Sequence, residues 1–279
     1  MVVRQPDDLI YTVVSEASCL HDFLSHLNPE TWVSDSTSEG WTIEDVVAHL
    51  SGNIDNWTRN LIRAVAGNTS PPEGQAYLAA GDRASHPRGP IARASRSQTG
   101  PQLLDEFIKG HESFRKVLES LTEDDWGKPC FHRRGILTIR MFIGLQVQEL
   151  AIHGWDIRSG FDNEAKLSEI SLPVLIDLIP RWINTAFTPQ AELPTPVIFR
   201  FEVSGPIYVR QDLTVTSGGY QMELVGKNPA DVIFRCNTSN YILMMYGRLE
   251  VERAIADGRL TMEGSGELAN TFNSWFKGF

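Results

Sequence analysis

The sequence predicts two folded parts, an all-α bundle of four helices followed by an α+β domain. Up to Gly160, apolar residues recur at three- and four-residue spacing, which is typical of amphipathic helices. After Gly160, short segments alternate apolar and polar residues, as half-buried strands do. We therefore expect domains at residues 1–163 and 164–279, and both lengths are ordinary for a folded domain.

Each bundle helix has recognisable ends. Asn28-Pro29 stops the first helix, and Thr42 is a good N-cap for the second because Glu44 and Asp45 follow it in the first turn. Pro101 suits the first turn of the third helix. The four expected helices are Asp7–Leu27, Thr42–Val65, Pro101–Leu121 and a segment that begins near Thr138.

The second domain mixes helices and strands. A helix is expected from Ile170 to Phe187, although Pro173 and Pro180 can start or bend it. Gly218-Gly219 indicates a hairpin turn. The expected strands are Val197–Ser204, Ile207–Arg210, Leu213–Thr216, Tyr220–Val225 and Asp231–Cys236, and helices follow near Ser239–Tyr246, Val251–Asp257 and Glu267–Phe276.

Composition limits the class of protein. The formal net charge of -10 argues against a nucleic-acid partner, and no apolar stretch is long enough to span a membrane. Cys19, Cys130 and Cys236 are scattered, so a disulfide framework is not expected. The first residues lack the pattern of a secretory signal. We expect a cytoplasmic monomer or homodimer that acts on a small molecule, without membrane or nucleic acid.

Four polar residues in the fourth helix form the first candidate site. Gln146, Glu149, His153 and Asp156 fall within an arc of roughly 80° on a largely apolar helix. Burying such groups without partners costs on the order of 1–3 kcal/mol each. A divalent cation between Glu149 and His153 would satisfy them, and so would a plain Glu–His hydrogen bond.

His49 in the second helix is the third candidate ligand. Asp45, Asn53 and Asn56 lie on the same side of that helix. Taken alone, His49 fits either a hydrogen-bonded core histidine or a ligand. If its helix faces the fourth helix, His49 joins Glu149 and His153, and two histidines with one glutamate are a recognised catalytic zinc set with an open fourth position.

Residues 67–100 form a long irregular connection with a concentration of basic residues. Long loops of this kind are commonly functional or mobile. The basic residues can be a solvated surface, or a lid whose arginine binds an anion. They are Arg83, His86, Arg88, Arg93 and Arg96.

Two segments together resemble a known family. Gly40–Leu50 and Gln148–Ile157 are similar to the mycothiol-dependent maleylpyruvate isomerases, which belong to the DinB-like metal-binding four-helix bundles. The segment from Asp231 to Phe276 resembles the sterol-carrier-protein-2-like domain of such proteins. The resemblance covers nearly the whole chain in order, and it implies a DinB-like bundle followed by an α+β sterol-carrier-protein-2-like domain.

The resemblance also implies a site. The family's metal ligands correspond to His49, Glu149 and His153. Asp156 is expected to support one of these ligands without binding the metal itself, as Gln146 could. Arg83 and Arg210 are guesses for substrate-binding arginines. In such enzymes a divalent metal, here expected to be zinc, activates water or a low-molecular-weight thiol such as mycothiol.

Three functions are compatible with these residues. The leading hypothesis is a metal-dependent enzyme that uses a thiol to isomerise or S-conjugate a small electrophile. The second is a thiol-independent metalloenzyme that hydrolyses or cyclises a biosynthetic intermediate. The third is a non-catalytic carrier of apolar ligands with a structural metal, in which Gln146 or Asp156 completes a closed set of four ligands.

Overall fold

The computed structural model describes residues 6–78, 99–188 and 193–277. The chain separates into two compact units, Met1–Ser171 and Leu172–Phe279, and each is described by itself. The first is a helical bundle and the second is built on a mixed sheet. This confirms the predicted fold class, a four-helix bundle followed by an α+β domain.

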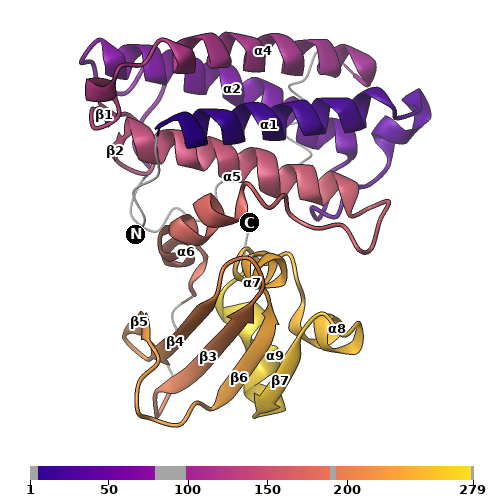
Figure 1. Cartoon of the computed structure of the whole chain (residues 1–279), viewed down its shortest axis with the longest axis vertical. Coiled ribbons are helices and arrows are strands. Elements are labelled where there is room, and N and C mark those ends of the chain that lie inside the picture. The colour runs from indigo at the N-terminus through magenta and orange to yellow at the C-terminus, as the bar shows by residue number, and fades with distance from the viewer. Residues whose placement is uncertain (1–5, 79–98, 189–192, 278–279) are drawn as a thin grey trace. The chain divides into compact units, whose positions relative to one another are not determined.

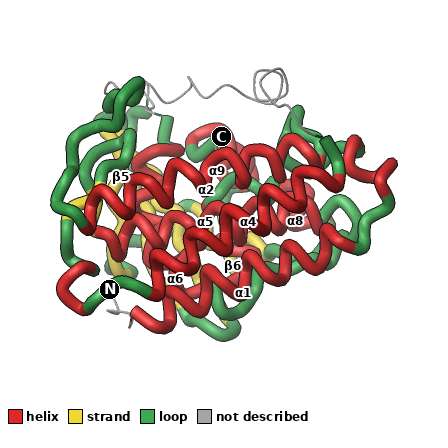
Figure 2. The backbone as a smooth tube through the Cα atoms, turned by 90° about the horizontal axis from the view of Figure 1, so that it is seen from above, coloured by secondary structure: helices red, strands yellow, loops and turns green. Residues whose placement is uncertain are grey.

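Four long helices lie side by side in the first unit (Figures 1 and 2). Helix α1 packs against α4 and α5, and helix α2 packs against the same two helices. The bundle therefore runs α1–α4–α2–α5 around its core, so that α2 and α5 are neighbours. The four helices are α1 (Pro6–Ser25), α2 (Ile43–Val65), α4 (Pro101–Glu119) and α5 (Ile139–Arg158).

Side-chain caps determine where α2 and α5 begin. The Thr42 hydroxyl accepts a hydrogen bond from the Asp45 amide, and the Asp45 carboxylate accepts one from the Thr42 amide, which is a capping box. The Thr138 hydroxyl accepts a bond from the Met141 amide at the start of α5. Both predicted starts are confirmed. The caps place His49 two turns into α2 and Glu149 near the middle of α5.

The bundle core is apolar and closely packed. Helix α4 lies close against α2 at Gly110, where a Cβ atom would lie 2.4 Å from Cγ2 of the buried Ile54. A residue without a side chain is therefore required there. Other fully buried core side chains come from all four helices: Leu20, Leu24, Val47, Ile54, Phe107, Phe114, Ile143 and Leu150.

Short elements connect the bundle helices where the sequence predicts only irregular connections. A two-stranded hairpin, β1 (Pro129–Cys130) and β2 (Leu137–Thr138), precedes α5. Two-residue strands are too short to show an alternating pattern, which is why the sequence does not reveal them. Two 3-10 turns complete the connections, η1 (Pro29–Val33) and η2 (Glu123–Asp125).

The second unit begins with α6 (Leu172–Ala186), which packs against α7. A five-stranded sheet follows in the order β5-β4-β3-β6-β7 (Figure 1). Strands β3 and β6 are parallel and the other neighbours are antiparallel. The elements are β3 (Val197–Ser204), β4 (Val209–Thr216), β5 (Gly219–Leu224), β6 (Val232–Asn237), α7 (Thr238–Met245), α8 (Val251–Ala256), β7 (Thr261–Gly264) and α9 (Gly266–Trp275).

Two predictions for the sheet are wrong. The expected strands Ile207–Arg210 and Leu213–Thr216 fall on one strand, β4, which begins only at Val209. The charged Asp212 looks like a break between two strands in the sequence. In the structure it belongs to a buried ion pair, in which Arg200 on β3 donates two hydrogen bonds to the Asp212 carboxylate. Strand β7 was not expected either. Pro180 lies inside α6 without ending it.

Within the described ranges, no helix is both long enough and apolar enough to cross a bilayer.

Candidate metal centre

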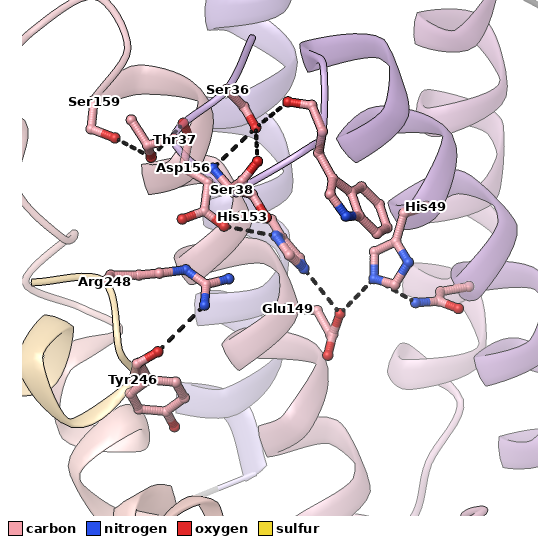
Figure 3. A network of polar contacts seen from close by, with 12 residues as sticks. Ser36, Thr37, Ser38, His49, Glu149, His153, Asp156, Ser159, Tyr246 and Arg248 are labelled. Carbon is pink, nitrogen blue, oxygen red and sulfur yellow. Dashed lines mark hydrogen bonds and ion pairs between the residues drawn. The ribbon is translucent and has the colours of Figure 1, made fainter. Parts of the chain in front are cut away.

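His49, Glu149 and His153 meet where α2 passes α5 (Figure 3). The Oε2 atom of Glu149 lies 3.1 Å from Nε2 of His49 and 3.7 Å from Nε2 of His153. One potential ligand atom from each residue lies within 4.8 Å of the other two. The side chains of His49, Glu149 and His153 are 28%, 24% and 16% exposed, so the cluster is partly buried and keeps some contact with solvent.

The Nε2 atom of His49 faces more partners than it can satisfy. The Asn53 amide nitrogen lies 3.0 Å from it, and the Glu149 carboxylate lies 3.1 Å from it. A bare Nε2 accepts from Asn53 but repels the carboxylate, whereas a protonated Nε2 does the reverse. A cation bound to both Nε2 and Oε2 removes the repulsion between the imidazole lone pair and the carboxylate, because both atoms then donate electron pairs to it.

Asp156 holds the ring of His153 in one orientation. Its Nδ1 atom lies 2.9 Å from Oδ2 of Asp156, one turn further along α5. The Asp156 side chain is completely buried. A carboxylate in this position favours a proton on Nδ1 and leaves the lone pair on Nε2, which faces Glu149. Asp156 therefore lies where a supporting residue was expected.

Trp41 forms one wall of the cluster. Its ring centre lies 5.3 Å from that of His49 in an edge arrangement and 6.4 Å from that of His153 in a stacked one. Trp41 directly precedes the N-cap of α2, where an apolar residue commonly packs back onto the helix. That position is the only signal in the sequence that could have pointed to it.

The loop before Trp41 is attached to the end of α5. The backbone amide and hydroxyl of Thr37 both donate to the carbonyl of Asp156, each at 3.0 Å. The Thr37 hydroxyl also lies 2.8 Å from that of Ser159, and Ser36 donates to the Trp41 carbonyl (Figure 3). Asp156, which orients His153, therefore also anchors the loop that carries Trp41.

Gln146 lies inside the bundle and contacts α4. Its Nε2 atom is 3.4 Å from Nε2 of His111, and its Oε1 atom is buried without a hydrogen-bond partner among the described residues. His111 donates from Nδ1 to the Phe107 carbonyl. Burial lowers the pKa of His111 to about 4. The closest polar partner of Gln146 is therefore this neutral histidine.

Of the two arginines suggested from the sequence, the structure describes only Arg210. Arg83 lies outside the described residues. Arg210 is in β4 of the second unit, where it is 68% exposed and lies 3.4 Å from Glu202 in an ion pair.

The donor set fits a divalent first-row metal ion. Two imidazole nitrogens and a carboxylate oxygen are ligands that zinc accepts, and three protein ligands leave a position for an exchangeable one. Within the part of the chain that the structure describes, no other group of three His, Cys, Asp or Glu side chains brings ligand atoms so close. These residues were the ones expected from the sequence, and the bundle brings them together.

Known families match both units. The mycothiol maleylpyruvate isomerase N-terminal domain matches residues 14–158, which is more than half of the 279-residue chain. The SCP-2 sterol transfer family matches residues 196–277. Among curated proteins, no match was found.

Solved structures with this fold include mycothiol-dependent maleylpyruvate isomerase. Its crystal structure superimposes with a TM-score of 0.64 at 13% identity, over 93% of each chain. A mutant of a mycothiol-dependent maleylpyruvate isomerase superimposes with a TM-score of 0.63 at 12% identity, also over 93% of each chain. At these identities the likeness establishes the fold alone.

Proposed function

Because the chain belongs to the mycothiol maleylpyruvate isomerase N-terminal domain family, we propose that it is a metal-dependent enzyme that uses a low-molecular-weight thiol. The thiol is of the mycothiol type, and the substrate is a small electrophile that is isomerised or S-conjugated. One observation carries the proposal: two imidazoles and a carboxylate from α2 and α5 bring their ligand atoms within 4.8 Å of one another.

His49, Glu149 and His153 would hold the metal, which we take to be zinc. A divalent cation held there would lower the pKa of a bound thiol, so that a thiolate would be present at neutral pH. With two neutral imidazoles and one carboxylate as ligands, the site keeps a net positive charge that favours an anion. The carboxylate of Asp156 keeps the His153 ring in its ligating orientation.

The proposed reaction begins with attack of the thiolate sulfur on an electrophilic carbon of the substrate. A sulfur–carbon bond forms with an electron pair from sulfur, and the π bond between this carbon and its neighbour breaks, its pair moving onto the electron-withdrawing group conjugated with it. In isomerisation, rotation about the resulting carbon–carbon single bond is followed by return of the electron pair, which re-forms the double bond and expels the thiolate. In S-conjugation the sulfur–carbon bond is kept, and the neighbouring carbon takes up a proton from water. Trp41 covers one side of the cluster and limits the access of water there.

Elemental analysis of the purified protein beside the H153A variant tests the metal site. About one equivalent of zinc in the wild-type protein and a clear loss in H153A are expected for a site with three protein ligands. A protein in which H49A and H153A are combined, and which keeps full metal content and activity, would refute the proposal. Turnover of electrophiles with and without added thiol then tests the use of thiol.

The match of residues 196–277 to the SCP-2 sterol transfer family favours one other function. In that reading the chain carries apolar ligands and its metal is structural. A structural metal is closed by four protein ligands, so an exchangeable water on the bound metal would argue against it. Turnover without any thiol would instead favour a thiol-independent metalloenzyme.

A further inference from the structure

Asn53 occupies a special place beside the candidate metal centre. It lies one turn after His49 on α2, and its Nδ2 atom is 3.0 Å from the Nε2 atom of that histidine. Nε2 is also the atom of His49 that lies next to the Glu149 carboxylate. The amide of Asn53 therefore points at the same small space into which the three candidate ligands point.

A bound cation would change the partner of this amide. When a metal takes the lone pair of His49 Nε2, that nitrogen no longer accepts a hydrogen bond from Asn53. The Asn53 N–H then needs another acceptor, because a polar group in a half-buried position is costly to leave unpaired. An occupied centre offers two kinds of acceptor, the Glu149 carboxylate and any exchangeable ligand on the metal.

We infer that Asn53 binds the exchangeable anionic ligand of the centre, by donating its amide N–H to the thiolate sulfur or to an anionic oxygen in the same position. The inference rests on the proposed function and adds a residue that favours an anion as the exchangeable ligand of the metal. A neutral amide suits this task because it donates in every protonation state and does not repel the anion. Hydrogen bonds to charged acceptors are also stronger than those to neutral ones.

Another asparagine on the same helix offers a matched control. Asn56 follows Asn53 by three residues, and its side-chain oxygen accepts a hydrogen bond from Arg59 on the same helix. Asn56 lies about two helical turns after His49 along α2, beyond Asn53. Replacing Asn56 removes the same amide group from α2 without touching the centre.

Cobalt-loaded protein tests the inference without an assay of turnover. Cobalt(II) occupies zinc sites of this kind, and a thiolate that binds it is visible by absorption. We would titrate cobalt-loaded wild type, N53A, N53D and N56A with 2-mercaptoethanol. We would also measure the affinity of each protein for cobalt by competition with a chromophoric chelator.

The inference predicts that N53A and N53D keep cobalt affinity near or above the wild-type value. Both should bind 2-mercaptoethanol about tenfold more weakly, as the loss of one hydrogen bond to a charged acceptor would produce. N53D keeps the size of the residue, so it separates loss of the donor from loss of packing. N56A should match the wild type in both measurements.

Two results would overturn the inference alone. One is unchanged thiol affinity in N53A and N53D. The other is a large loss of cobalt affinity in both variants, which would mean that Asn53 supports Glu149 or the metal rather than the exchangeable ligand. Wild-type protein that binds no cobalt, or binds cobalt but no thiol, would instead refute the proposed function, and the inference with it.

Discussion

The Nδ1 atom of His153 lies 2.9 Å from Oδ2 of Asp156, a carboxylate with no exposed surface. The two residues are one turn apart on α5, so the contact is built into a single helix. It leaves the other ring nitrogen of His153 directed at Glu149. The backbone carbonyl of the same Asp156 holds the loop before Trp41. Both His153 and Trp41 are therefore anchored to the end of α5.

Replacing Asp156 is expected to weaken metal binding without removing a ligand. D156N keeps the shape of the side chain but loses the charge that favours a proton on Nδ1 of His153. Loss of such a supporting group typically lowers metal affinity by about 10–100-fold. Competition with a chromophoric chelator measures this affinity. D105N, which changes an exposed carboxylate on α4, is the control and should bind zinc like the wild type.

A D156N protein with wild-type zinc affinity would show that the contact does not support the ligand. A folded D156N protein that binds no zinc at all would indicate a larger role for Asp156, as a ligand itself. Far-ultraviolet circular dichroism distinguishes that case from unfolding.

His111 is expected to make stability depend on pH. Burial lowers its pKa from an ordinary value of 6.5 to about 4. Between these values the unfolded chain binds a proton that the folded chain does not, so the free energy of unfolding rises with pH. From pH 4 to pH 6.5 the contribution of His111 is on the order of 3 kcal/mol, since one pKa unit corresponds to about 1.4 kcal/mol.

Urea unfolding at several pH values, with H111Q beside the wild type, measures this contribution. The wild-type free energy should fall more steeply below pH 6.5 than that of H111Q. H26Q, at the exposed His26, is the control for replacing a histidine by glutamine. Equal slopes for wild type and H111Q would show that His111 takes up its proton equally in both states.

Gly110 is expected to tolerate no side chain. A Cβ atom there would lie 2.4 Å from Cγ2 of Ile54, a buried, β-branched side chain with little freedom to turn away. Overpacking of this kind costs about 1–3 kcal/mol, which exceeds the helix-propensity gain of about 1 kcal/mol. Urea unfolding of G110A should therefore show a lower free energy of unfolding.

Gly52 on α2 has the opposite surroundings and serves as the comparison. Nothing lies within 4 Å of its Cβ position, and the residue is exposed. G52A should raise the free energy of unfolding by about 0.5–1 kcal/mol, because alanine favours a helix over glycine. A stabilised G110A protein would mean that α2 and α4 can move apart at little cost.

Family and fold class could be read from the sequence because their signals are local. Helical spacing, the caps at Thr42 and Thr138, and the alternation in Val197–Ser204 each depend on residues close together in the chain. The residues from Gly40 to Leu50 and from Gln148 to Ile157 carried the resemblance to the family, and the family match confirms it. Strand β4 was divided wrongly because an ion-paired Asp212 looks like a break when its partner Arg200 is unknown.

By itself, the sequence determined which residues could ligate a metal. The helical positions of Glu149, His153 and Asp156 follow from a turn of about 100° per residue, and His49 follows from the cap of its own helix. Only the tertiary structure decided that α2 lies beside α5, that Gln146 turns to His111, and that Asn53 and Trp41 border the cluster. The reason is physical: the contact between His49 and Glu149 joins residues 100 positions apart, and packing across the bundle core, rather than any local preference, brings them together.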